Sequence, residues 1–495
     1  MTDQPKKKKS KFFSFRVTHP LAIFMLVFAL PFALFGWREL YVYFFEQDPP
    51  RIVVSALPPG IGVDGGRVTV TIKDELSGLK EVSVIAKQNF SSREIIHREY
   101  PGTQGMNEDT LIIELGPVEG FSEGDVEIVI TAHDRAIWKN AKQQRFSLTL
   151  DYKAPAIEVL TKEVRAARGG SVLAFYRLKE ERPSFTGVAF GEWRFPGFPA
   201  KYLDASFEAA PDVYFALFPV PAAVNAKKDV LAIVARDQVG NETKKPISLK
   251  IRKKPSKISN IEITEDYLNR DFRNYLIANN LYKPEQSKVV QFDNQKEKDQ
   301  TESLLKQFAD LREYRDQRIL SKLEPILSRP KSRKYWNDSF IRPTFADTRH
   351  RFGDMIQYTF EGKEVVKSMH EGITFEPYFT HPVALTNSGT VIFSERIPDA
   401  GNTLIVDHGF GLCTMYANLD LLLHREGAEL QRGEDLGKPG ASGLFAAGEL
   451  EYQMLLHGIQ VDPREWWDDE WVAKNITKKT LFLKKKLSLP LLPLN

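Results

Sequence analysis

The pattern of hydrophobic and polar positions changes several times along this 495-residue chain, beginning with an uncharged run. The run "PLAIFMLVFALPFALFGW" (residues 20–37) follows a lysine-rich tail. Eighteen residues at about 1.5 Å each give about 27 Å, against about 30 Å for a hydrocarbon core. The next residues, "RELYVYFF", supply aromatic side chains for a headgroup layer, and they contain no small-x-small cleavage site of a signal peptide. We therefore expect a transmembrane helix over residues 18–45, a basic cytoplasmic tail over 1–17, and the bulk of a single-pass inner-membrane protein in the periplasm or outside.

Two series of strand-length runs begin at about residue 52. The first contains "RVTVTI", "VSVIAK", "TLIIEL" and "VEIVITAHD", and the second contains "SVLAFYRL", "DVYFALFPV", "DVLAIVARD" and "PISLKI". Alternating or clustered β-branched residues at this length are typical of strands. The ends of the two series align, which places Asp134 opposite Asp237. This long repeat predicts two tandem β-sandwiches, over residues 52–152 and 153–255.

Both segments resemble the immunoglobulin-like modules of bacterial surface proteins in pattern and in that one shared corner. Such modules usually space or bind. We expect a stalk that holds the C-terminal part of the chain away from the membrane.

A helical connector is predicted over residues 256–340, after the linker "KKPSKIS". Apolar residues recur there at three- and four-residue spacing, which is typical of amphipathic helices. One stripe consists of Leu304, Leu305, Phe308, Leu311 and Tyr314. A helical hairpin packed on a neighbouring domain is the simpler interpretation, and a partner-docking or self-inhibiting helix is the alternative.

Composition adds two exclusions. The formal net charge is only +3 and no long basic stripe occurs, so nothing indicates a nucleic-acid partner. The single cysteine, Cys413, excludes an intrachain disulfide and a zinc site built from several thiolates.

The segment over residues 341–467 carries an ordered set of motifs. These are "RFGD", "HEGITF", "HPVALTNSGTVIF", "GNTLIVDHGFGLCTMYANL", "EGAELQRGEDLGK" and "GELEYQMLLHGIQVDPREWW". Together they resemble the lysostaphin- or LytM-type zinc endopeptidases, which cut peptidoglycan cross-links. The resemblance implies an all-β domain of the duplicated hybrid type with a cleft between two small sheets, and hence a mainly β chain.

The resemblance also implies where the zinc and catalytic positions fall. The first zinc ligand of the family corresponds to His370 in "HEGIT", but its second ligand, an aspartate, corresponds to Thr374. The family's His-x-His strand maps onto "ELE": a catalytic histidine becomes Glu449 and the third zinc ligand becomes Glu451. A further catalytic histidine corresponds to Asn418 in "YANL". Four of these five positions have changed.

These changes predict an inactive domain. A catalytic zinc needs three protein ligands, and a threonine hydroxyl is a poor one. His370 and Glu451 are then vestigial metal ligands, and no cofactor is expected unless an altered site still holds zinc. Other interpretations remain open: a hydrogen-bonded His370, a solvated or cation-facing pair of Glu449 and Glu451, or a site for an oxygen-preferring divalent ion.

Other residues have simpler roles. His408 in "DHGFG" is expected to be structural, whereas His381 and His457 could approach the cleft. The tryptophans of "REWWDDEW" suggest packing first and wall binding second, and the tail over 468–495 is expected to be irregular. The sequence thus favours an envelope protein that binds peptidoglycan or regulates a wall hydrolase. An active peptidase with an altered metal site and a structural scaffold are the alternatives.

Overall fold

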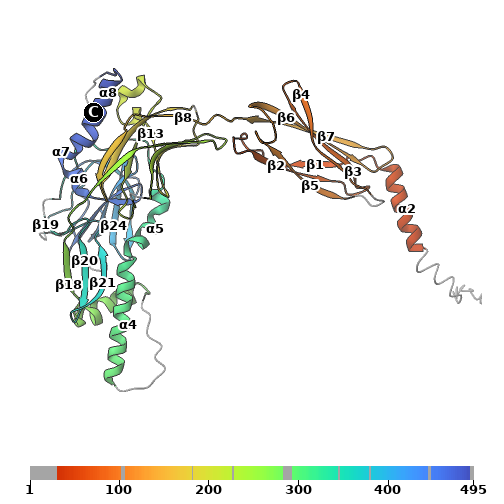
Figure 1. Ribbon diagram of the computed structural model, residues 1–495. Helices are drawn as coiled ribbons and strands as arrows, with labels where there is room; N and C mark the ends of the chain where they lie inside the picture. The colour runs from red at the N-terminus through yellow and green to blue at the C-terminus, as the bar shows by residue number, and fades with distance from the viewer. Residues whose placement is uncertain are drawn as a thin grey trace, which may run out of the picture. The chain divides into compact units, whose positions relative to one another are not determined.

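The chain forms two compact units in the computed structural model (Figure 1). Unit 1 consists of residues 1–154 and 238–241, and unit 2 of residues 155–237 and 242–495. Strands hold 44% of the residues and helices 19%, so the chain is mainly β, as predicted. The structure describes residues 30–101, 106–180, 182–225, 228–281, 293–343, 346–377, 381–443 and 448–490.

Unit 1 contains two antiparallel sheets around one hydrophobic core. One sheet has the order β1-β2-β5 and the other β4-β3-β6-β7. The alternation in "RVTVTI" turns Val68, Val70 and Ile72 inward, where they meet the inward residues of the second sheet. The arrangement is a two-layer sandwich, and its immunoglobulin-like character stays a prediction. The elements are α2 (Leu30–Phe45), β1 (Arg51–Val54), β2 (Gly66–Lys73), β3 (Leu79–Gln88), β4 (Ser91–Glu99), β5 (Glu108–Leu115), β6 (Gly124–Asp134) and β7 (Ala141–Leu150).

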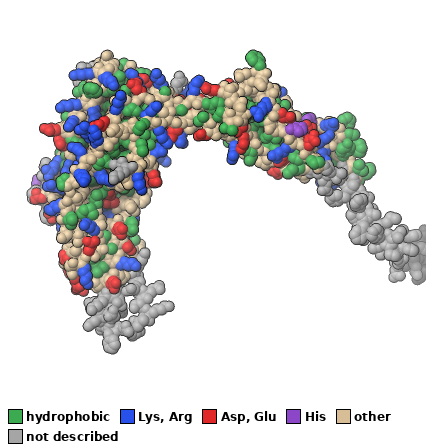
Figure 2. All heavy atoms as spheres, in the orientation of Figure 1, with side chains coloured by type: hydrophobic (Ala, Val, Ile, Leu, Met, Phe, Trp, Pro, Cys, Tyr) green, Lys and Arg blue, Asp and Glu red, His purple; other side chains and the backbone are tan. Residues whose placement is uncertain are grey.

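Helix α2 covers the second half of the predicted membrane span. Within the described residues, no helix is both long and apolar enough to cross a membrane. The basic tail and residues 18–29 of the predicted span lie outside the described part of the chain. Figure 2 shows hydrophobic side chains gathered at the α2 end of unit 1. The exposed aromatic residues there are Trp37, Tyr41, Tyr43, Phe44 and Phe45.

A second β module begins unit 2. Its two main sheets have the orders β13-β14-β10-β8 and β12-β11-β15-β16, and they face one another across a core. Strand β17 pairs in parallel with β9. The strands are β8 (Ala156–Val159), β9 (Glu163–Ala167), β10 (Ser171–Lys179), β11 (Phe185–Phe190), β12 (Trp193–Pro196), β13 (Phe198–Pro199), β14 (Val213–Pro219), β15 (Leu231–Arg236), β16 (Glu242–Pro246) and β17 (Ser248–Arg252).

Strand β10 is buried on both faces, so the second module is not a free-standing stalk segment. Its residues Val172 and Ala174 point into the module's own core, whereas Leu173 and Phe175 point the other way. The outer set joins a second core that also contains residues from the C-terminal domain. These are Phe410, Leu412, Met454, Leu456, Val461, Trp466, Val472, Ile476 and Leu483. The expected stalk role is therefore wrong for this module, because its outer face is a packing surface.

The connector contains a strand as well as helices. Strand β18 pairs in parallel with β20, and the resulting sheet, β18-β20-β21, packs against α4. Leu304 and Phe308 of the predicted stripe are buried, but Tyr314 is 47% exposed because α4 ends just before it. The elements are β18 (Ile258–Glu262), a π-helical turn η4 (Tyr267–Phe272), α3 (Arg273–Ala278), α4 (Asp293–Glu313) and α5 (Arg315–Leu327).

A large sheet with the order β19-β22-β27-β25-β24-β23-β26 forms the centre of the C-terminal domain. Strand β28 pairs with β27 at its side. The strands are β19 (Ala346–His350), β20 (Met355–Phe360), β21 (Lys363–Met369), β22 (Ile373–Pro377), β23 (Gly389–Ile397), β24 (Gly401–Gly409), β25 (Leu412–Leu419), β26 (Glu429–Leu430), β27 (Leu450–Leu456) and β28 (Ile459–Val461).

The chain after β28 is largely helical up to Lys486, so the expectation of an irregular tail over 468–495 is wrong for residues 469–486, whereas residues 491–495 lie outside the described part of the chain. Asp462 and Asp468 cap the first two helices by accepting backbone hydrogen bonds. Trp466 is fully buried, in agreement with the predicted packing role. The elements are α6 (Pro463–Trp467), α7 (Asp469–Val472), a π-helical turn η5 (Ala473–Thr477) and α8 (Lys478–Lys486).

A buried ion pair ties α8 to the second module. The Lys484 ammonium donates to Asp204 at 2.8 Å, and both side chains are nearly inaccessible. Replacing Lys484 with methionine leaves a buried carboxylate without this partner, which typically costs about 3–5 kcal/mol. We expect Lys484→Met to lower the unfolding free energy of unit 2 by about this amount in a denaturant titration. The exposed neighbour supplies the control, Lys485→Met. Equal stability of the two variants would contradict the docking of α8.

Candidate functional site

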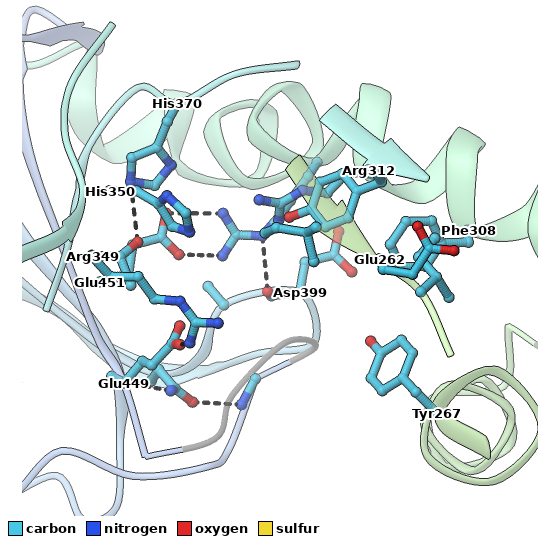
Figure 3. Close-up of a pocket in the computed structure, with 18 of the residues that line it drawn as sticks. Glu262, Tyr267, Phe308, Arg312, Arg349, His350, His370, Asp399, Glu449 and Glu451 are labelled. Atoms are coloured by element: carbon cyan, nitrogen blue, oxygen red, sulfur yellow. Dashed lines mark hydrogen bonds and ion pairs between the residues drawn. The ribbon is translucent and has the colours of Figure 1, made fainter. Parts of the chain in front are cut away.

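A cavity of about 320 Å³ opens between the connector and the C-terminal sheet (Figure 3). Residues of β18, η4 and α4 line one side, including Glu262, Tyr267 and Phe308. The opposite side contains all five positions that the family resemblance singles out, brought together from four segments of the chain. These are His370, Thr374, Asn418, Glu449 and Glu451.

Strand pairing explains why these residues meet. His350 of β19 is paired with Thr374 of β22, and Thr374 is paired in turn with Glu451 of β27. Glu451 is also paired with Ala417 of β25. Directly paired residues project to the same face of a sheet, so a row of side chains crosses four strands at this level. The register of strand pairing thus determines which side chains of the sheet line the cavity.

His370 is a buried, neutral histidine. It follows β21, where its backbone N–H donates to the Asp354 carbonyl at 2.8 Å. Its Nε2 lies 3.1 Å from Thr374 Oγ1, and its ring is stacked edge-on against that of His350 at 5.8 Å. Burial lowers the pKa of His370 to about 3, so the imidazole carries no charge at neutral pH. His370 is therefore a hydrogen-bonded histidine, which is one of the alternatives that the sequence leaves open.

Glu451 is held by an arginine from the connector. Arg315, the first residue of α5, donates from both terminal nitrogens to the two carboxylate oxygens, the first bond being 2.9 Å long. Gln453 donates a further bond of 2.8 Å to the same carboxylate. Burial alone would raise the pKa of Glu451, but the Arg315 guanidinium outweighs burial and lowers it well below the ordinary value. Glu451 is therefore an ionised carboxylate whose oxygens are already engaged.

Glu449 faces a different arginine. Arg349 of β19 donates to its Oε1 and also lies 3.5 Å from Glu376. Burial raises the pKa of Glu449 despite this contact. Each of the two glutamates thus faces a guanidinium group, Glu451 that of Arg315 and Glu449 that of Arg349.

Asn418 stabilises the backbone beside the cavity. It adopts a left-handed conformation (φ 67°), which asparagine tolerates better than most residues. Its amide donates to the carbonyls of Gly440, at 2.8 Å, and Glu449, and its Oδ1 accepts from the Gly443 N–H at 2.8 Å. These bonds join the loop over 440–443 to the strands.

The three other histidines that the sequence singles out lie away from the cavity. His408 is fully buried, with one ring nitrogen 2.7 Å from the Ser388 carbonyl and the other 2.8 Å from Thr414 Oγ1, which fits the structural role expected of it. His457 contacts the Leu217 carbonyl at 2.8 Å, in the second module. His381 is exposed and does not line the cavity. The expectation that His381 and His457 could approach the cleft is therefore wrong.

The residues at this position do not fit a catalytic zinc ion. Thr374 offers a neutral hydroxyl that is already hydrogen-bonded to His370, and both oxygens of Glu451 accept bonds from Arg315. A guanidinium cation at the same place would also repel a divalent cation. Within the described ranges, no group of three or more His, Cys, Asp or Glu side chains with metal-ligand spacing occurs at this cavity.

Sequence reasoning missed the two arginines and His350. A signal for Arg315 is present in α5, where the buried positions are Arg315, Ile319, Leu323 and Leu327, each four residues apart. An arginine at the head of an otherwise apolar stripe indicates a buried cation that needs a partner. Arg349 and His350 show no comparable periodicity, since their position depends on pairing with a distant strand.

Comparison with known proteins agrees with this geometry. Residues 368–463 match peptidase family M23. The chain is 32% identical over 116 residues to peptidoglycan DD-endopeptidase ShyB of Vibrio cholerae, a match that covers 23% of this chain and 27% of that protein. It is 25% identical over 140 residues to murein hydrolase activator EnvC of Escherichia coli, covering 28% and 30%. This chain thus spans about a quarter of the length of these curated relatives. The match identifies residues 368–463 as a peptidase M23 domain of the LytM type.

Proposed function

We propose that this protein is a non-catalytic M23 protein of the bacterial envelope, which binds peptidoglycan peptides or regulates a wall hydrolase. The observation that carries the proposal is the bidentate contact of Arg315 with Glu451. It places a permanent organic cation against the position that corresponds to a zinc ligand in the family. The charge of that carboxylate is balanced without a metal.

The proposal follows from what the site lacks for peptide hydrolysis. Water has a pKa of about 15.7 when free and about 7 when bound to a catalytic zinc, so hydroxide is scarce without the metal. Asn418 spends its amide on backbone carbonyls and cannot transfer a proton. Glu449 is engaged by Arg349. Neither of these two positions, Asn418 and Glu449, is therefore free to activate water or to protonate a leaving amine.

Recognition of a peptide is a better fit to the cavity than chemistry. One side offers aromatic and aliphatic surface from Ile261, Tyr267 and Phe308, and the other offers polar groups at fixed positions. Apolar walls with a few oriented polar groups are typical of binding sites for small or peptide ligands. Wall peptides, which carry both apolar methyl groups and carboxylates, are the ligand class we propose.

The relatives support a role at the cell wall, either as a peptidoglycan hydrolase or as a regulator of one. ShyB is named as a peptidoglycan endopeptidase and EnvC as a murein hydrolase activator. The contacts of Arg315 and Asn418 favour an activator-like or binding role for this chain over an altered peptidase. We further propose that residues 18–45 anchor the chain in the inner membrane, and that the two β modules are immunoglobulin-like and lie in the periplasm.

The first test measures metal content and hydrolysis together. The full-length protein, purified from zinc-supplemented cells, is expected to carry far less than one zinc per chain. It is also expected to release no fragments from purified peptidoglycan, because Asn418 and Glu449 stand where the family has catalytic histidines and are engaged in other contacts. An active zinc-dependent M23 endopeptidase serves as the positive control. Stoichiometric zinc with cleavage, both lost in His370→Ala and Glu451→Ala, would overturn the proposal in favour of an altered peptidase.

The second test measures the buried ion pair by a double-mutant cycle. Arg315→Met alone leaves the Glu451 carboxylate buried without its cation, and we expect a loss of about 3–5 kcal/mol in unfolding free energy. The double variant Arg315→Met/Glu451→Met should recover most of this loss, since both charges are removed together. If the double variant lost as much unfolding free energy as Arg315→Met and Glu451→Met together, the two charges would not be coupled.

A further inference from the structure

Three buried carboxylates meet in unit 1, far along the chain from the M23 domain. Glu46 follows α2, Asp74 follows β2, and Asp134 ends β6. Their exposed fractions are 7%, 4% and 0%, and a carboxylate oxygen of each lies within 4.8 Å of the others. Carboxylates are rarely buried without a compensating cation, so this grouping requires an explanation.

No ion pair within the described residues balances this charge. Within the described parts of the chain, no lysine or arginine forms an ion pair with any of the three acids. The nearest arginine in sequence, Arg135, directs its guanidinium to the carbonyl oxygens of Leu79 and Tyr100. Backbone N–H groups satisfy part of the charge, since Ser77 donates to Glu46 at 3.1 Å and Gly78 donates to Asp74 at 2.7 Å. Three carboxylates this close together still repel one another unless a cation or a proton lies between them.

One carboxylate oxygen of the group has no hydrogen-bond partner among the described residues. Asp134 accepts a bond of 2.8 Å from Asn140 through Oδ2. Its Oδ1 is fully buried and has no hydrogen-bond partner among the described residues. A buried, unpaired carboxylate oxygen costs free energy, and such an atom in a native fold commonly marks an ion or water site.

We infer that Glu46, Asp74 and Asp134 bind one Ca²⁺ ion at the junction between α2 and the first β module. Oxygen atoms that share one Ca²⁺ at about 2.3–2.6 Å each lie at most about 5 Å apart, which agrees with the observed grouping. The three side chains supply only oxygen donors, which suit Ca²⁺ better than zinc. Backbone carbonyls and water complete its six to eight ligands.

The ion would fix the helix to the module. The last turn of α2 already contacts the loop after β6, because the Ile137 N–H donates to the Tyr43 carbonyl at 2.8 Å and the Asn140 amide donates to the Glu46 carbonyl at 3.1 Å. A cation shared by Glu46 and Asp134 adds a charged link across the same junction. Calcium binding therefore couples the direction of α2 to the first module.

The experiment uses the full-length chain, freed of metal by chelation, and follows thermal unfolding of unit 1 and direct Ca²⁺ binding by equilibrium dialysis. We expect one Ca²⁺ per chain with half-saturation between about 0.1 and 1 mM, as in extracellular modules. Mg²⁺ at the same concentration should produce less than a tenth of the response, because it demands a tighter octahedral shell. An equal response to both ions would contradict the calcium assignment.

Two variants separate a metal ligand from a structural residue. Asp134→Asn should weaken Ca²⁺ binding at least tenfold, yet in chelator its melting temperature should equal or exceed that of the wild type, because a repulsive charge is gone. A purely structural role for Asp134 predicts a lower melting temperature in both conditions. Glu46→Gln, outside the sheets, is the second variant and should weaken binding similarly. Asp64→Asn, at an exposed turn of the same module, is the matched control. Unchanged Ca²⁺ affinity in Glu46→Gln/Asp134→Asn would overturn the proposal.

Discussion

The contact between Arg315 and Glu451 is the interaction on which the cavity of this protein depends. It joins α5 to β27 across 136 positions of sequence, and both side chains are almost completely removed from water. Burying either charge alone is expensive, so the connector helix and the sheet stabilise one another through this pair. The same contact also disfavours metal binding by Glu451, because a carboxylate bound by two guanidinium N–H groups has little capacity left for a metal ion.

A second constraint comes from the shared core of unit 2. Strands β10 and β14 supply side chains to two hydrophobic clusters, one inside their module and one against the C-terminal domain. Helices α6 and α8 close the second cluster, and the pair of Lys484 with Asp204 holds the last helix in place. The cavity therefore lies on a well-packed body formed by the second module and the C-terminal domain, and the connector packs on one edge of this body.

Much of this organisation could be predicted from local pattern. Alternating residues indicated the strands of both β modules, and ordered motifs located His370, Thr374, Asn418, Glu449 and Glu451 in one site. The partners of those residues could not be predicted, because Arg315 and Arg349 reach the site through packing and strand register. Periodicity describes which face of an element is apolar, but it does not say which distant element covers that face. The C-terminal helices were missed for a related reason: "TKKTLFLKKKLSL" is rich in lysine, and its buried Lys484 is stabilised by an acid far away in sequence.

The burial of β10 on both faces has a consequence for how this chain can change over evolutionary time. A module with a wet outer surface can be duplicated, shuffled or lost by recombination without harm to its neighbours. The second module has no such freedom, because its removal would expose a large hydrophobic surface of the M23 domain to water. The two are expected to be inherited as a single block, and a gene fragment that begins at the linker would encode an incomplete, aggregation-prone body.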